Sequence, residues 1–139
     1  MREWVLDCSA TLPWVFSDEA TPECDALLDC LADGGAALVP DLWHLELGNV
    51  LLGARRRGRI DQAGIEAFLN HLNALEIVVD RQTHSQAWGK ILDLAYQYKL
   101  STYDAAYLEL ALRRGLPLAT LDQALRQSAK DSGVTLLLT

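Results

Sequence analysis

Short apolar segments alternate with longer amphipathic segments along the whole chain, and this alternation limits the possible folds more than any other feature. The apolar segments lack the strict polar–apolar alternation of a strand that has one face in water. They predict strands at residues 5–8, 37–39, 76–79, 118–121 and 134–138. Short strands of this kind, separated by helices, are typical of a parallel sheet covered on both faces. We therefore predict an α/β protein.

Periodic apolar residues predict helices between the strands, and several helices carry clear end signals. Thr21 is placed to cap a helix that starts at Pro22. Ser9 is placed to cap the predicted helix at residues 10–16. Gly58 follows the last periodic residue of a long apolar helix and should end it. The predicted helices cover residues 10–16, 23–33, 41–57, 61–73, 83–98, 103–114 and 123–130.

The composition is that of an ordinary globular protein. The 139 residues are 50% hydrophobic and 22% charged, which predicts a single domain, residues 1–139, with one core. Arg2 and Glu3 interrupt the apolar start of the chain, so we expect no secretory signal, and no apolar run reaches the ~18 residues of a membrane span. The odd number of cysteines, Cys8, Cys24 and Cys30, argues against a disulfide framework. These features predict a soluble protein of the reducing cytoplasm.

Four acidic residues occupy positions from which they should meet in one pocket. They are Asp7, Glu46, Asp104 and Asp122. Asp7 and Asp122 follow predicted strands, Glu46 lies on the apolar face of its predicted helix, and Asp104 opens another helix. Parallel sheets bind ligands at the carboxyl ends of their strands, where Asp7 and Asp122 are expected. Repulsion and burial would raise the pKa of such carboxyl groups unless a cation were present. The pattern therefore predicts a site for an oxygen-preferring ion, Mg²⁺ or Mn²⁺.

Taken singly, three of these residues have an alternative structural explanation. Asp122 is placed to cap the helix 123–130, and Ser101 with Asp104 resembles a capping box. Asp7 could form a local turn after its strand. Glu46 has no comparable explanation, because a charged group on an apolar helical face is seldom buried alone. Capping therefore stays open for the individual residues, while the set of four favours a shared pocket.

Four segments, in this order and at these separations, resemble the PIN domain, and in particular the small bacterial VapC-type toxins of toxin–antitoxin pairs. The segments are VLDCSA, LELGNVL, LSTYDAAYLELA and ATLD. The resemblance implies a three-layer α/β/α fold with a mainly parallel five-stranded sheet. It also implies RNA cleavage that depends on one or two Mg²⁺ or Mn²⁺ ions held by Asp7, Glu46, Asp104 and Asp122, with Thr120 and Ser9 as polar supports. Cys8 stands where the family often has threonine.

The predicted chemistry is hydrolysis of a phosphodiester by metal-activated water. We expect Asp7 and Asp104 to be direct ligands, Asp122 to contact a second or shared ion, and Glu46 to be a ligand or to orient the water. The resemblance further implies a homodimer and an antitoxin that buries a hydrophobic segment beside the site. The net charge of −7 argues against a broad basic RNA-binding surface. An intact acidic set makes a catalytically silent PIN-like binding module a weaker alternative.

Two groups of side chains have competing interpretations. One group could contact the RNA backbone; its members are Arg55, Arg56, Arg57 and Arg59. Basic residues at the C-terminus of a helix also complement the helix dipole, which is the alternative explanation for this group. The other is predicted to be mainly core: Trp14, Trp43, Trp88, Tyr96 and Tyr98. A receiver-like phosphoacceptor domain is a further alternative, but it needs a lysine at a strand end. Lys90, Lys99 and Lys130 all fall in or beside predicted helices.

Overall fold

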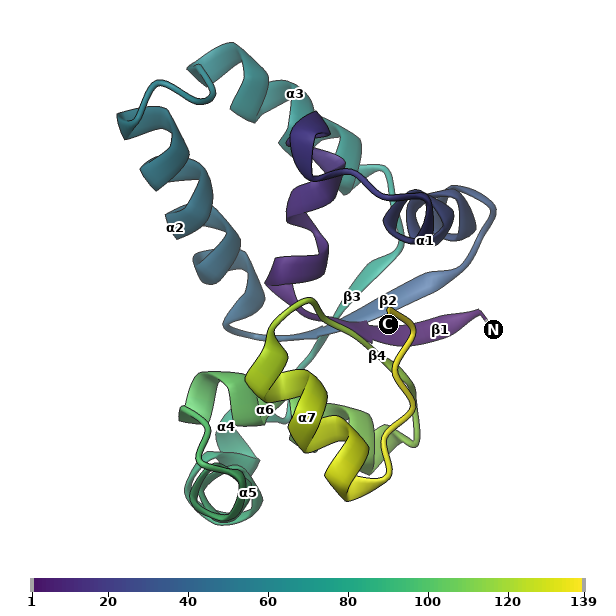
Figure 1. Ribbon diagram of the computed structural model, residues 1–139, viewed down its shortest axis with the longest axis vertical. Helices are drawn as coiled ribbons and strands as arrows, with labels where there is room; N and C mark the ends of the chain where they lie inside the picture. The colour runs from purple at the N-terminus through teal and green to yellow at the C-terminus, as the bar shows by residue number, and fades with distance from the viewer. Residues whose placement is uncertain (1, 139) are drawn as a thin grey trace.

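A computed structural model describes residues 2–138; Met1 and Thr139, the two ends of the predicted domain, lie outside the described residues. The strands are β1 (Glu3–Leu6), β2 (Ala36–Pro40), β3 (Ile77–Asp80) and β4 (Leu118–Ala119). They form one parallel sheet in the order β3-β2-β1-β4 (Figure 1). The predicted α/β class with a parallel sheet is therefore confirmed.

The prediction of five strands is wrong, because the segment 134–138 does not form a strand. The Leu118 N–H donates to the Thr135 carbonyl at 2.9 Å, and the Leu137 N–H donates to the Leu118 carbonyl at 3.0 Å. These bonds make one isolated parallel bridge, between Leu118 and Leu136. Since β4 is only two residues long, it offers no further backbone groups along which the ladder could continue.

The helices lie in two layers, one on each face of the sheet (Figure 1). The first layer contains α1 (Pro22–Ala32), α2 (Trp43–Arg56) and α3 (Gln62–Asn73). The second contains α4 (Thr83–Gln86), α5 (Leu92–Tyr98), α6 (Thr102–Arg114) and α7 (Gln123–Ser132). A π-helical stretch, Ala87–Ile91, joins α4 to α5, so the predicted helix 83–98 is one continuous helical segment with a wider turn inside it.

The helix predicted at residues 10–16 is wrong. Residues 8–19 instead form three 3₁₀ turns, Cys8–Ala10, Leu12–Trp14 and Ser17–Glu19. Pro13 has no N–H to donate inside an α-helix, which favours short turns here. Ser9 lies within the first turn and caps no helix, whereas the predicted cap at Thr21 is confirmed by a 3.2 Å bond from the Cys24 N–H to its hydroxyl.

The core lies on both faces of the sheet and is densest around β1 and α6. Residues 105–111 of α6 are all buried. Two aromatic residues predicted for the core are exposed instead: Trp88 is 93% and Tyr96 is 90% accessible. The opposite side of their helical segment packs inward through Ile91 and Leu94, so the two aromatics face water on the outer layer.

One buried ion-pair network ties α6 to the edge of the sheet. The Arg113 guanidinium donates to both carboxylate oxygens of Asp80, at 3.1 and 2.7 Å, and to Glu109, at 2.8 Å. Asp80 and Glu109 are both buried. Arg113 therefore joins two carboxylates that would otherwise be isolated in the interior.

The strand order places a switch point between β1 and β4. The chain moves from β1 outward to β2 and β3, and then returns to the other side of β1 to form β4. A crevice opens at the carboxyl ends of strands where such a reversal occurs. Within residues 2–138, no helix is long and apolar enough to cross a membrane.

Candidate active site

Asp7 follows β1 directly and lies at the base of the site. The residue is only 5% exposed, and its Oδ2 accepts hydrogen bonds from the Ser9 hydroxyl at 2.6 Å and the Thr120 hydroxyl at 2.7 Å. Burial raises the pKa of Asp7, the two hydroxyls oppose the rise, and the charge of Asp122 adds to it. The Leu121 N–H donates to Ser9 at 2.9 Å, which joins the ends of β1 and β4. Ser9 and Thr120 thus each donate a hydrogen bond to the same oxygen of Asp7.

Glu46 reaches the same region from the first turn of α2. The hydroxyl of Tyr107, a residue of α6 that is 0% exposed, donates a hydrogen bond to Glu46 Oε1. Burial raises the pKa of Glu46, and the charges of Asp7 and Asp104 raise it further, while the Tyr107 bond opposes them. Glu46 is half-buried beside the buried face of α2, which Trp43, Leu47, Leu51 and Ala54 form, and the Tyr107 hydroxyl is its specific partner.

Asp104 lies in the first turn of α6 but does not cap it. Its backbone N–H donates to the Ser101 hydroxyl at 3.1 Å, so Ser101 is the cap. Among the described residues, no side chain or backbone group donates a hydrogen bond to the Asp104 carboxylate. Partial burial raises the pKa of Asp104 from 3.8 to about 6, with added contributions from the charges of Asp122 and Asp7. This carboxylate is therefore held near the others without a protein partner.

Asp122 has both roles that the sequence left open. Its Oδ2 accepts a 2.9 Å bond from the Leu125 N–H, which makes it the N-cap of α7. Its own N–H donates to the Thr120 hydroxyl at 3.1 Å. The same residue also lines the pocket that contains the other three carboxylates. Capping and site membership are compatible because the cap uses one carboxylate oxygen.

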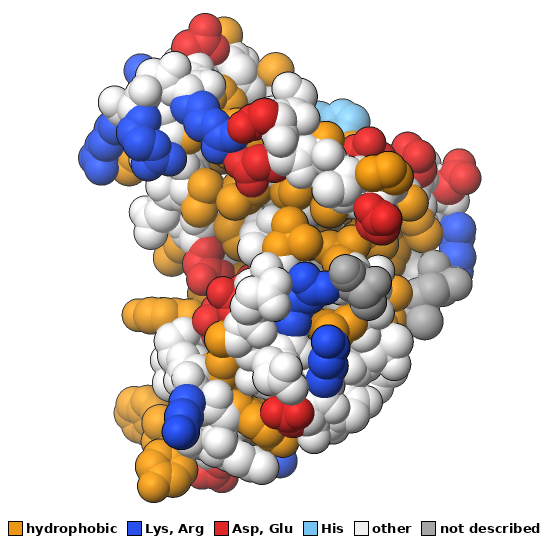
Figure 2. All heavy atoms as spheres, in the orientation of Figure 1, with side chains coloured by type: hydrophobic (Ala, Val, Ile, Leu, Met, Phe, Trp, Pro, Cys, Tyr) orange, Lys and Arg blue, Asp and Glu red, His pale blue; other side chains and the backbone are white. Residues whose placement is uncertain are grey.

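The four carboxylates line one open pocket of about 360 Å³. The other lining residues are Cys8, Ser9, Leu12, Asn49 and Val50. Burial raises the pKa of the Cys8 thiol to about 12, and the charges of Asp7 and Glu46 add to this rise. In Figure 2, acidic side chains gather on the surface between α2 and the helices of the second layer. The negative charge of the chain is thus locally concentrated where parallel strands end.

The four acidic residues would offer only carboxylate oxygens to a metal ion. Carboxylate oxygens are the ligands that Mg²⁺ and Mn²⁺ prefer. Burial raises the pKa of Asp7, Glu46 and Asp104, and the charges of neighbouring carboxylates add to this rise, which a bound cation would oppose. Across residues 2–138, however, no three His, Cys, Asp or Glu side chains lie close enough together to form a ready-made cluster. The carboxylate oxygens of the donor set fit such an ion in their chemistry.

Two residues of the site were missed in the sequence. Tyr107 holds Glu46, and Asn49 lines the pocket one helical turn after Glu46. Both could have been found from helical spacing, because Tyr107 follows Asp104 by three positions and Asn49 follows Glu46 by three. The apolar periodicity of α6 instead favoured the reading of Tyr107 as a core residue.

The four arginines kept as RNA contacts do not share one environment. Arg59 donates to Asp18 and Glu19 at 2.7 and 2.8 Å, and it lies 4.0 Å from the Phe16 ring centroid. Arg55 donates to Gln62. The remaining two, Arg56 and Arg57, are exposed at the end of α2, where Figure 2 shows basic side chains gathered.

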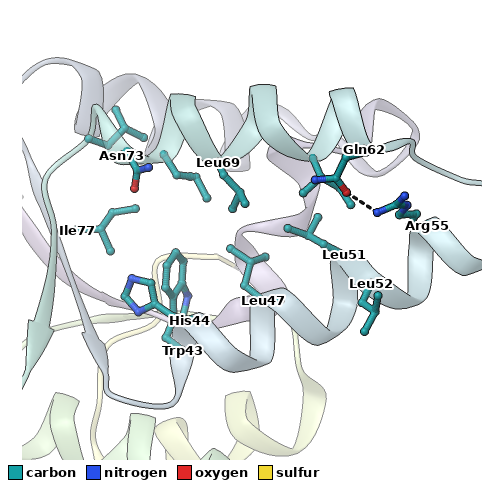
Figure 3. A pocket seen from close by; sticks show the side chains of 14 residues that line it. Trp43, His44, Leu47, Leu51, Leu52, Arg55, Gln62, Leu69, Asn73 and Ile77 are labelled. Carbon is teal, nitrogen blue, oxygen red and sulfur yellow. Dashed lines mark hydrogen bonds between the residues drawn. The ribbon is translucent and has the colours of Figure 1, made fainter.

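An apolar groove lies between α2 and α3, and the residues of α2 that line it differ from those of α2 that line the acidic pocket. Figure 3 shows its walls, with Leu47 and Leu51 of α2 facing Leu69 of α3. The groove has a volume of about 590 Å³. Trp43 and Ile77 lie at its inner end, and the bond between Arg55 and Gln62 marks its outer end. Leu52 and Leu69 remain 43% and 39% exposed, so the groove leaves apolar surface in contact with water.

A parallel sheet between two helical layers, with an acidic pocket at the switch in strand order, is the arrangement expected of a PIN domain. The sequence matches the PIN domain family over residues 4–131, and the chain belongs to this family. The resemblance stated from the four sequence segments is thereby confirmed. No curated protein matches the sequence.

Two solved structures have a similar fold. One is PAE2754 from Pyrobaculum aerophilum, with a TM-score of 0.70 and 23% identity, covering 97% of this chain and 89% of that chain. The other is a toxin–antitoxin complex from Klebsiella pneumoniae, with a TM-score of 0.59 and 19% identity, covering 96% of this chain and 97% of that chain. At these identities the similarity establishes the fold.

Proposed function

We propose that the protein is a Mg²⁺- or Mn²⁺-dependent endoribonuclease and the toxin of a type II toxin–antitoxin pair of the VapC type. The observation that carries the proposal is the shared pocket of Asp7, Glu46, Asp104 and Asp122 at the carboxyl ends of β1 and β4. The PIN family supports a nuclease, and the Klebsiella pneumoniae neighbour supports the toxin assignment. We also propose that the protein acts in the cytoplasm, where an RNA substrate would be found.

We propose a separate role at the metal ion for each of the four carboxylates. Asp7 and Asp104 would hold the ion directly, Asp122 would contact the same or a second ion, and Glu46 would be a ligand or orient the water. When bound, the ion lowers the pKa of a water molecule and offsets the charge that builds on the phosphate. The Ser9 and Thr120 hydroxyls would favour the ionised form of Asp7, because their hydrogen bonds lower its pKa against the effect of burial, and they would hold its carboxylate in place through Oδ2.

The substrate would approach a surface with little basic charge. Arg56 and Arg57 are exposed and, among the described residues, their side chains form neither an ion pair nor a hydrogen bond, whereas the exposed Arg55 donates to Gln62. They would contact the RNA backbone, whereas Arg59 is engaged with Asp18 and Glu19. Replacing Arg56 and Arg57 by glutamine should weaken RNA binding, with a reduced dependence of affinity on salt.

RNA cleavage by the purified protein, freed of any antitoxin, tests this proposal. Cleavage should require Mg²⁺ or Mn²⁺ and stop in EDTA, and both Asp7→Asn and Asp104→Asn should abolish it. Asp93→Asn, at an exposed position of α5 outside the pocket, is the matched control and should cleave normally. Full cleavage in EDTA, or by both site variants, would exclude the mechanism.

A catalytically silent binding module is the second candidate. It is favoured by one observation, the absence of a ready-made cluster of three metal-binding side chains within residues 2–138. Such a module would bind its partner equally well with and without Asp104→Asn and would cleave no RNA under any metal condition. The same cleavage assay therefore decides between the two candidates.

The antitoxin would bind the apolar groove between α2 and α3. An amphipathic segment could place apolar side chains between Leu47 and Leu69 (Figure 3). Leu69→Glu should then abolish binding of the antitoxin while leaving RNA cleavage intact. The neighbouring reading frame supplies the protein to use in this assay. Unchanged binding by Leu69→Glu would place the partner elsewhere.

A homodimer would use the exposed stripe Trp88, Leu92 and Tyr96 on the outer layer. The three residues recur at every fourth position and are 93%, 50% and 90% exposed. Apolar side chains gathered on one face in this way mark contact surfaces. The stripe lies on the second helical layer, while the groove of α2 and α3 lies on the first, so the two contacts would not compete.

A further inference from the structure

We propose that Tyr107 is a positioning residue that makes Glu46 present a single oxygen, Oε2, to the pocket. This inference rests on the proposed function and narrows the role of one of its four carboxylates. The Tyr107 hydroxyl donates to Glu46 Oε1, and the tyrosine ring is 0% exposed. Tyr107 itself does not line the pocket, so it acts through Glu46.

The same division of oxygens recurs in two of the other carboxylates. Asp7 Oδ2 accepts the hydroxyls of Ser9 and Thr120, and Asp122 Oδ2 accepts the Leu125 N–H. Each of these residues, like Glu46, therefore has one carboxylate oxygen engaged by a side chain or helix end. Asp104 differs, because no donor among the described residues contacts its carboxylate. The site thus combines three carboxylates that each offer one oxygen with one carboxylate that offers two.

The tyrosine is suited to fix a glutamate in this position. Glu46 has three side-chain torsions and is repelled by Asp7 and Asp104, so on its own it would turn toward water. Tyr107 has two torsions, its ring is packed in the core, and it belongs to the same helix as Asp104. The hydroxyl consequently links α2 to α6 and keeps two carboxylates from different helices in register across the pocket.

Manganese binding measures this role without relying on catalysis. Isothermal titration of the metal-free protein with MnCl₂ should show Tyr107→Phe binding about tenfold more weakly than the unmodified protein. Tyr98→Phe removes a hydroxyl from a partly buried tyrosine outside the pocket and should leave the affinity unchanged. In a Glu46→Ala background, Tyr107→Phe should cause no further loss, because nothing remains for the hydroxyl to hold.

The possible results separate this inference from the proposed function. If Glu46→Ala weakens Mn²⁺ binding and Tyr107→Phe does not, the inference is wrong and the metal site stands. An equal loss from Tyr107→Phe in both backgrounds would also overturn it, since that result indicates a general packing defect. If the unmodified protein binds no Mn²⁺, the proposed function and the inference both fail.

A second measurement keeps Tyr107 in place, in case Tyr107→Phe does not fold. Tyrosine absorbs at longer wavelength when its hydroxyl donates to a carboxylate. Glu46→Ala should therefore move the absorption of one of the four tyrosines to shorter wavelength. An unchanged tyrosine spectrum would show that Tyr107 and Glu46 are not bonded in solution.

Discussion

Asp104→Asn should stabilise the metal-free protein although it removes a residue of the proposed site. The Asp104 carboxylate is raised in pKa from 3.8 to about 6 by burial and by the charges of Asp122 and Asp7. A carboxylate in these surroundings is less stable than in the unfolded chain. Asparagine carries no charge and relieves the repulsion, at the cost of a function that needs the charge.

The size of the effect follows from the pKa. A change from 3.8 to about 6 corresponds to an upper limit of about 3 kcal/mol at ~1.4 kcal/mol for each tenfold change in proton affinity. Asp104 is only partly buried, so screening by water reduces the expected gain to about 1 kcal/mol. For a chain of this length the melting temperature should rise by roughly 3–5 °C.

The pH dependence has a defined sign. Because the folded pKa is raised, the folded protein binds the extra proton between pH 3.8 and about 6, and stability falls as the pH rises through that window. Urea unfolding in EDTA should therefore show Asp104→Asn more stable than the unmodified protein above pH 6 and equal to it below pH 4. Asp93→Asn is the control and should show no such difference.

Manganese should reverse this order. An ion at one hundred times its dissociation constant would stabilise the unmodified protein by about 2.7 kcal/mol, and Asp104→Asn should gain much less. A variant that is less stable than the unmodified protein in EDTA at pH 7.5 would refute the reasoning, because it would mean that the carboxylate makes a favourable contact in the folded state.

Three further perturbations test separate parts of the structure. Asp80→Asn should lower the free energy of unfolding by about 1–3 kcal/mol at pH 7, because it breaks the ion pair with Arg113. Arg113 holds the pKa of Asp80 below its ordinary value, so this loss of stability should become smaller when urea unfolding is repeated below pH 4. Asp122→Ser should keep the cap of α7, and therefore the melting temperature to within a few degrees, while the affinity for Mn²⁺ falls. If the melting temperature and the Mn²⁺ affinity fall together, Asp122 has a structural role alone. Trp88→Glu should convert a dimer to a monomer in sedimentation experiments, and an unchanged mass would remove the outer stripe as the contact.

The sequence predicted the parts of the fold that depend on local patterns. Four of the strands, the long helices and the cap at Thr21 follow from apolar periodicity and end signals. The prediction of a fifth strand was wrong because residues 134–138 have the composition of a strand, but β4 offers them only Leu118 as a pairing partner. Strand pairing depends on a neighbour distant in sequence, which local composition does not report.

The position of the four carboxylates was predicted, and their individual contacts were not. The strand-end positions of Asp7 and Asp122 place them at one edge of the sheet wherever the strands are parallel. The pairing of Tyr107 with Glu46 depends on how α2 and α6 pack, and the pairing of Arg59 with Asp18 depends on the turns before α1. Such contacts arise from the tertiary structure and leave no pattern in the sequence between them.

A crystal grown or soaked with MnCl₂ tests the central claim most directly. Anomalous scattering should place manganese between the Asp7 and Asp104 carboxylates, with Glu46 contributing one oxygen and Asp122 lying at the edge of the same pocket. An ordered protein with no manganese in this pocket, or with manganese bound only elsewhere, would contradict the claim that these four acids form a metal-dependent site.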